Sequence, residues 1–265
     1  MEIRLIDKQQ LDLLDSCRRI AEINYLDNLV LLGDLHTPCI NLTRIYGLFN
    51  SNDQLQSFFV IFDGFELSSV VFPVKMIEAV FFKKMEFLLS ILSHEFIILS
   101  LELLEKDLEN FVKINRCAKD NCLIIDNSTN LTSSDFPFLK KAQKDDYERI
   151  NNFYMKINAS PWNPIQLESN FYHFIDIDDE IVACGGTHFE TSKLAQLGNV
   201  YVLEGHRRQG YGSILTSAIT RDILTKKDYA TLFVYHENLP AIALYEKLGF
   251  RLHKPARLFF CEKNE

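Results

Sequence analysis

The sequence predicts a mixed α/β protein made of two halves with a similar order of elements. Three observations support this. The 265-residue chain suits two domains of ordinary size. A stretch rich in Ser, Thr, Asn and Lys around a proline separates two regions of stronger hydrophobic patterning. Both regions show the pattern of a helix, a hairpin, a further strand, a helix and a strand, which indicates a tandem repeat.

The polar stretch between the two regions sets the expected domain boundaries. We expect a first domain at residues 1–130, a linker at 131–143 and a second domain at 144–265. Each predicted sheet is mixed and mostly antiparallel, with helices on its faces.

The first half opens with apolar residues at helical spacing and continues with β-branched and aromatic runs. Its predicted elements are helices at 11–17 and 23–30, strands at 44–49, 57–62 and 67–72, a helix at 76–92 and a strand at 95–101. The turn-rich residues 50–54 join the first two strands as a hairpin.

The second half repeats this order. Its predicted elements are a helix at 145–157, strands at 171–177, 181–189 and 196–203, a helix at 212–225, a strand at 229–235, a helix after Asn238, and closing strands at 250–252 and 258–261. Asn238 is a preferred capping residue, and Gly249 accepts the left-handed conformation with which helices end.

Charge and composition exclude several classes of function. The net charge is −8, whereas a general nucleic-acid binder needs a basic surface. The chain contains no apolar run long enough for a bilayer and does not begin with a signal-peptide pattern, so we expect a cytoplasmic protein without a membrane partner. The six cysteines form no CxxC pair or Cys/His cluster, so we expect no metal.

The most informative stretch, 199–215, passes from a β-run through a basic, glycine-containing turn into an amphipathic helix. Gly210 and Gly212 lack a Cβ, so the backbone there can approach phosphates and direct N–H groups at them. The helix start contributes free amides, and Arg207 and Arg208 contribute charge-assisted donors. This pattern favours a pyrophosphate site. A strand-to-helix turn that uses glycine for geometry and arginine for solubility is the alternative.

Arg207-x-x-Gly210-x-Gly212 resembles the Arg/Gln-x-x-Gly-x-Gly/Ala signature of the GNAT N-acyltransferase superfamily. Asn238, Ala241, Tyr245 and the Gly249-Phe250 pair resemble a second segment of that family, at the expected distance. The resemblance covers about residues 171–260, and it extends more loosely upstream to Asp145.

The resemblance implies a cofactor and a set of contacts. The acyl donor would be acetyl-CoA or a longer acyl-CoA, and pantetheine would enter where strands 196–203 and 229–235 splay apart. The implied contact residues are Val200, Tyr201 and Val202 for pantetheine, Arg207, Arg208, Gln209, Gly210, Tyr211, Gly212 and Ser213 for the pyrophosphate, and Asn238, Ala241 and Tyr245 beside the cofactor.

The first half departs from this pattern. It carries residues 72–76, Phe-Pro-Val-Lys-Met, where the glycine loop would stand. We therefore expect a degenerate GNAT-like domain that does not hold CoA and that closes over the second half or shapes its acceptor site. Glycine N-acyltransferase-like proteins have a similar tandem arrangement.

Acyl transfer to an amine requires a polarised thioester carbonyl and protonation of the departing thiolate. Tyr245 is the candidate proton donor, with packing against Gly249 and Phe250 as its alternative role. A backbone N–H near Val202 is the candidate for polarising the carbonyl. Glu204 and His188 are candidate bases; a surface glutamate and a hydrogen-bonded core histidine are the commoner roles of such residues, and a water chain could serve in their place.

Trp162 is a candidate for the acceptor entrance, with a hydrophobic plug as the alternative. The sequence thus predicts an N-acetyltransferase acting on a small-molecule or peptide amine, as a monomer or homodimer. Two alternatives are a non-catalytic acyl-CoA-binding regulator and a tandem protein that takes an aminoacyl group from charged tRNA.

Overall fold

The computed structural model describes residues 1–74, 78–92, 94–129, 131, 136–159, 162–169 and 171–264. The chain forms two compact units, Met1–Asp120 with Pro255–Glu265, and Asn121–Lys254. The sequence instead suggested contiguous domains. The difference arises because two long strands, β6 (Val112–Asp126) and β12 (Arg251–Lys263), each contribute residues to both units.

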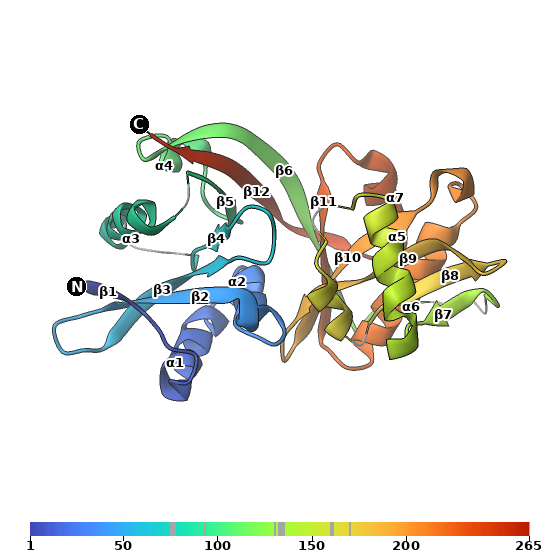
Figure 1. Cartoon of the computed structure of the whole chain (residues 1–265), viewed down its shortest axis with the longest axis horizontal. Helices are drawn as coiled ribbons and strands as arrows, with labels where there is room; N and C mark the ends of the chain where they lie inside the picture. The colour runs from blue at the N-terminus through green and yellow to red at the C-terminus, as the bar shows by residue number, and fades with distance from the viewer. Residues whose placement is uncertain are drawn as a thin grey trace. The chain divides into compact units, whose positions relative to one another are not determined.

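The first unit carries the elements drawn from blue to green in Figure 1. They are β1 (Glu2–Leu5), α1 (Leu11–Glu22), α2 (Leu29–Asp34), β2 (Thr43–Phe49), β3 (Leu55–Phe62), β4 (Ser69–Val71), α3 (Glu78–Ile91), β5 (Glu95–Ser100) and α4 (Glu105–Leu108). The hydrogen-bonded strand order is β1-β2-β3-β4-β5-β12. Only β4 and β5 pair in parallel among the pairings seen in this unit's described residues.

Strand β3 has apolar side chains on both faces because helices cover both faces of this sheet. Phe58 and Val60 belong to a core cluster with residues of α1 and α2, whereas Phe59 and Ile61 pack with residues of α3. Alternate residues of a strand point to opposite faces, so an uninterrupted apolar run is what a doubly covered strand requires.

The second unit contains the elements that carry the glycine loop. They are β7 (Leu139–Lys141), α5 (Tyr147–Lys156), β8 (His173–Ile177), β9 (Glu180–Glu190), β10 (Leu194–Val202), α6 (Tyr211–Leu224), β11 (Tyr229–Tyr235) and α7 (Leu239–Lys247), with short 3-10 turns at Lys144–Asp146, Pro164–Glu168 and Glu204–His206. The strand order is β6-β11-β10-β9-β8-β7.

Two core clusters stabilise this unit. Leu215 and Ile219 of α6 pack with apolar residues of β9, β10 and β11. Ile150 and Tyr154 of α5 form a separate cluster with Tyr172 and with residues of β8 and β9. The mixed α/β fold with two tandem units is therefore confirmed.

Several elements differ from the sequence prediction. The predicted linker 131–143 contains strand β7, and residues 132–135 of it lie outside the described residues. The two predicted closing strands are one continuous strand, β12, and neither β1 nor β6 was predicted. The helix predicted at 23–30 begins only at Leu29. Among the described residues, no helix is both long and apolar enough to cross a bilayer.

Candidate functional site

The site lies where β10 and β11 of the second unit separate. These parallel strands pair from Leu194↔Tyr229 to Leu197↔Leu232, and no pairing follows although β10 continues to Val202 and β11 to Tyr235. Among the residues that the structure describes, the backbone of β10 beyond Leu197 thus has no strand partner on its β11 side. This opening matches the splayed strands that the resemblance implies.

Strand β10 also contains a β-bulge at the opening. Its pairing with β9 runs from Gly198↔Gly186 to Tyr201↔Cys184, so Asn199 and Val200 together face the single residue Gly185. Asn199 has a left-handed backbone with φ of 56°. A bulge with its first residue in this conformation is a recognised type, usually formed with glycine.

Beyond the bulge, the alternation of strand hydrogen bonds fixes which backbone groups face the opening. The Leu203 amide donates to the Val182 carbonyl at 2.9 Å, which directs Leu203 toward β9. Because neighbouring residues of a strand direct their N–H and C=O groups to opposite sides, the N–H and C=O of Val202 point away from β9. Val202 therefore presents to the opening an amide that donates no hydrogen bond within the described part of the chain.

The 207–213 loop leads from this opening into α6. Gly210 is the N-cap residue of α6, has φ of 85°, and has no side chain capping the helix. Among the described residues, the backbone amides from Arg208 to Ser213 donate no hydrogen bond. A Cβ on Gly210 would meet no atom within 4 Å, so space is open beside these amides. Free amides at a helix start, beside open space, are the feature that binds phosphate groups.

The two arginines of the loop differ in their contacts. The Arg207 guanidinium donates from Nε to the Val202 carbonyl at 3.1 Å and lies 5.6 Å from the centre of the Tyr201 ring. Arg208 is exposed, has φ of 63°, and has no ion-pair partner among the described residues. Arg208 is thus the loop cation without a competing protein contact.

Helix α7 places the second set of predicted residues. The Asn238 side chain accepts a hydrogen bond from the Ala241 amide at 3.3 Å, which confirms the predicted cap. Tyr245 packs edge-on against Phe250, with ring centres 5.8 Å apart, and burial raises the pKa of its phenol to about 12. Because of this raised pKa the hydroxyl stays protonated at neutral pH, and among the described residues it has no hydrogen-bond partner, so it is available as a donor.

The two candidate bases, Glu204 and His188, lie in different environments. Glu204 is exposed in the 3-10 turn Glu204–His206. His188 lies against Gly198, and burial lowers the pKa of its imidazole to about 4. The Gln166 amide donates to His188 Nδ1 at 2.8 Å, which places the proton of a neutral ring on Nε2. His188 is therefore a hydrogen-bonded histidine with little basicity at neutral pH.

Trp162 packs inside the second unit. Its ring stacks on Tyr154 with centres 4.0 Å apart, and its Nε1 donates to Asn151 at 3.0 Å. These contacts agree with the hydrophobic-plug interpretation. Gln166 and Asn199 were not predicted as site residues, although a glycine inside a β-run, here Gly198, is a signal of a bulge.

The corresponding loop of the first unit has different backbone chemistry. The Val74 amide donates to the side chain of the buried residue Asn28 at 2.9 Å. An amide that already has a protein acceptor is not available to a phosphate. Residues 75 and 76 of this loop lie outside the described residues.

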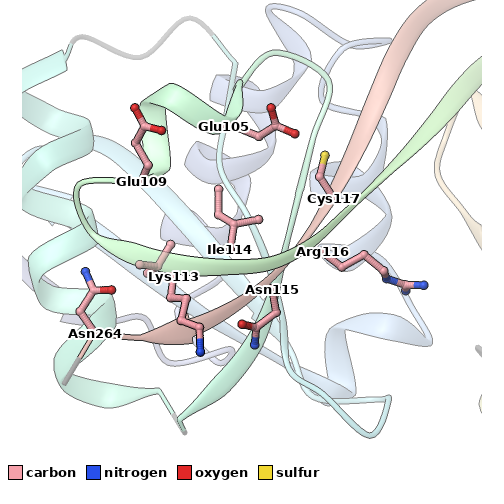
Figure 2. Close-up of a pocket in the computed structure, with 9 residues that line it drawn as sticks. Glu105, Glu109, Lys113, Ile114, Asn115, Arg116, Cys117 and Asn264 are labelled. Atoms are coloured by element: carbon pink, nitrogen blue, oxygen red, sulfur yellow. The ribbon is translucent and has the colours of Figure 1, made fainter.

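The first unit has a hollow elsewhere, of about 540 Å³, beside α4 and β6 (Figure 2). Its lining residues are Glu105, Glu109, Val112, Lys113, Ile114, Asn115, Arg116, Cys117 and Asn264. The lining mixes both signs of charge and contains no glycine, so it lacks the chemistry of a phosphate loop. Among the described residues, no cluster of His, Cys, Asp and Glu could hold a metal ion.

Comparisons with known proteins agree with the fold of this chain. Residues 183–258 match the family model described as FR47-like protein, and no curated protein matches the chain. A GNAT-family acetyltransferase from Colwellia psychrerythraea is 15% identical over 99% of this chain and 100% of its own, with a TM-score of 0.65.

Two further solved structures share the fold. A tandem GNAT protein from the clavulanic acid biosynthesis pathway is 10% identical over 100% of this chain and 99% of its own, with a TM-score of 0.68. A GCN5-related N-acetyltransferase from Kribbella flavida is 17% identical over 94% of this chain and 96% of its own, with a TM-score of 0.59. Identities this low establish the fold rather than the activity. The matched segment and the shared architecture show that this chain is a GNAT-fold protein with two tandem units.

Proposed function

We propose that the second unit transfers an acyl group, most simply acetyl, from acyl-CoA to a primary amine by direct attack within a ternary complex. One observation carries the proposal: the free amides from Arg208 to Ser213 stand at the start of α6, beside two strands that have separated. Acyl-CoA supplies a diphosphate for such amides and an activated thioester carbonyl.

The 207–213 loop would bind the diphosphate. Its successive amides and the positive end of the α6 dipole attract an anion, and Arg208 adds an exposed positive charge. Asn238 and Ala241 lie at the start of α7, which follows the end of β11, and Val200 to Val202 offer backbone groups along β10.

Catalysis would depend on two donors of this chain. The Val202 amide faces the opening and would stabilise the negative charge that develops on the carbonyl oxygen during attack. The Tyr245 hydroxyl would donate a hydrogen bond to the departing sulfur. The attacking amine must lose its own proton. Because the pKa of His188 is about 4, that proton would pass to water rather than to His188.

An amine-library screen with acetyl-CoA and longer acyl-CoAs, followed by thiol release, tests this function. We expect release that depends on one class of amine and one donor length. CoA binding by calorimetry without product from any amine would instead identify a non-catalytic acyl-CoA-binding protein. Absence of CoA binding would refute both and leave transfer from aminoacyl-tRNA to be assayed.

A further inference from the structure

Asn199 adopts a left-handed backbone conformation, which is uncommon for a residue with a side chain and unusual within a strand, although asparagine tolerates it better than most. Its φ of 56° lies in the left-handed region, within a strand and at the edge of the proposed acyl site. Such a conformation persists only where the surroundings determine it, and it concentrates at functional sites. The contacts of Asn199 show what holds it there.

Three buried side chains of the second unit form hydrogen bonds with Asn199, one with its backbone carbonyl and two with its side-chain amide. The Tyr154 hydroxyl donates to the Asn199 carbonyl at 2.8 Å. The Asn199 side-chain amide donates to Gln166 Oε1 at 2.8 Å and to the Tyr172 hydroxyl at 3.0 Å. Gln166, Tyr154 and Tyr172 are at most 3% exposed. Burial raises the pKa of both phenols, so both remain hydrogen-bonding hydroxyls at neutral pH.

The position of the bulge decides which backbone groups face the opening. The extra residue of a bulge can stand at several positions along a strand. When the bulge moves by one position, the residue that it passes turns its N–H and C=O groups to the opposite side. With the bulge at Asn199, the Val202 amide points away from β9. A bulge that moved past Val202 would turn this amide toward β9.

We propose that Asn199 and Tyr154 are positioning residues that pin the β10 bulge and so keep the Val202 amide aimed at the thioester carbonyl. This inference rests on the proposed function. It assigns a purpose to a buried polar network that the binding of the diphosphate does not require.

The test uses Asn199→Gly and Tyr154→Phe in the full-length protein. Glycine accepts the left-handed backbone but removes both side-chain bonds, and phenylalanine removes the hydroxyl that donates to the Asn199 carbonyl and also interacts with the Cys184 thiol. Asn158→Gly is the matched control, because Asn158 also has a left-handed φ, of 49°, but is exposed after α5. The probe is acetyl-CoA labelled with ¹³C at the carbonyl.

The first readout is the infrared carbonyl band of the bound probe, which a donated hydrogen bond moves to lower frequency. We expect this displacement in the wild type and in Asn158→Gly, and its loss in the two positioning variants, with acetyl-CoA affinity within about threefold of wild type. Turnover with an amine that the wild type acylates should fall by roughly tenfold to a hundredfold. The upper value is comparable to the effect of removing one oxyanion-hole donor.

The outcomes separate this inference from the proposed function. A displaced band that the variants lose, without transfer to any amine, supports the positioning role and refutes the transferase. A band and a rate that are unchanged in both variants overturn the positioning role. A common loss of affinity, band displacement and melting temperature also overturns it, because it indicates a structural role. A wild type that does not bind acetyl-CoA overturns both proposals.

Discussion

Gly210→Asn should abolish tight CoA binding without unfolding the second unit. Gly210 has φ of 85° and is the N-cap of α6. Asparagine tolerates the left-handed region better than other residues with side chains and is a favoured N-cap, so the helix should form normally. A Cβ at this position meets no protein atom within 4 Å. The new side chain would therefore occupy the space that the proposal gives to the diphosphate.

The magnitude follows from the amides that lose their ligand. A hydrogen bond to a charged group contributes about 1.5–3 kcal/mol, so loss of two such bonds costs ~3–6 kcal/mol. Since about 1.4 kcal/mol corresponds to a factor of ten, CoA affinity should fall by at least roughly a hundredfold. The cost to the fold should stay below about 1 kcal/mol, since Gly and Asn differ little at an N-cap.

Calorimetry with two ligands measures the effect. CoA should bind the variant weakly, whereas pantetheine, which lacks the diphosphate, should bind both proteins equally. Gly205→Asn is the control, because a Cβ on Gly205 also meets no atom within 4 Å and this residue lies before the free amides. A Gly210→Asn protein that binds CoA like the wild type would refute the phosphate role of the loop, as would an equal loss in the control.

Three further substitutions test other parts of the structure. Tyr245→Phe should lower turnover by roughly tenfold or more, with CoA affinity nearly unchanged. Because the pKa of Tyr245 is about 12, the pH–rate profile of the wild type should show no titration of Tyr245 below pH 9. Equal loss of rate and affinity would show that Tyr245 serves only in packing. Asp34→Asn should raise the melting temperature at pH 8 but not at pH 3.5. Burial raises the pKa of Asp34 to about 8, so its contribution to stability is fully present below the unfolded pKa of 3.8 and is lost as pH rises toward 8; parallel melting curves across pH would contradict this. Gly198→Ala should destabilise the second unit by about 1–3 kcal/mol, because the new Cβ would lie 1.9 Å from His188 Cδ2, and adding His188→Ala should recover part of that loss in a double-mutant cycle; strictly additive effects would contradict the clash.

The sequence by itself determined the elements that local chemistry specifies. The period of its apolar residues placed β2, β3, α5, α6 and β11 to within about two residues, close to the accuracy that such patterns allow. The cap at Asn238 and the left-handed Gly249, with φ of 98°, follow from side-chain hydrogen bonding and the absence of a Cβ. The glycine loop was recognisable because its pattern consists of consecutive residues.

Only the tertiary structure decided features that join residues distant in the sequence. Strand β12 lies between β5 and β6, with Phe259 opposite Ile98 of β5, and no local pattern identifies a strand's partners. The low basicity of His188 results from burial and from Gln166, and the bulge at Asn199 is held by Tyr154, which lies 45 residues earlier. Burial and hydrogen bonding across the fold set these properties, so they become visible only when the chain brings those groups together.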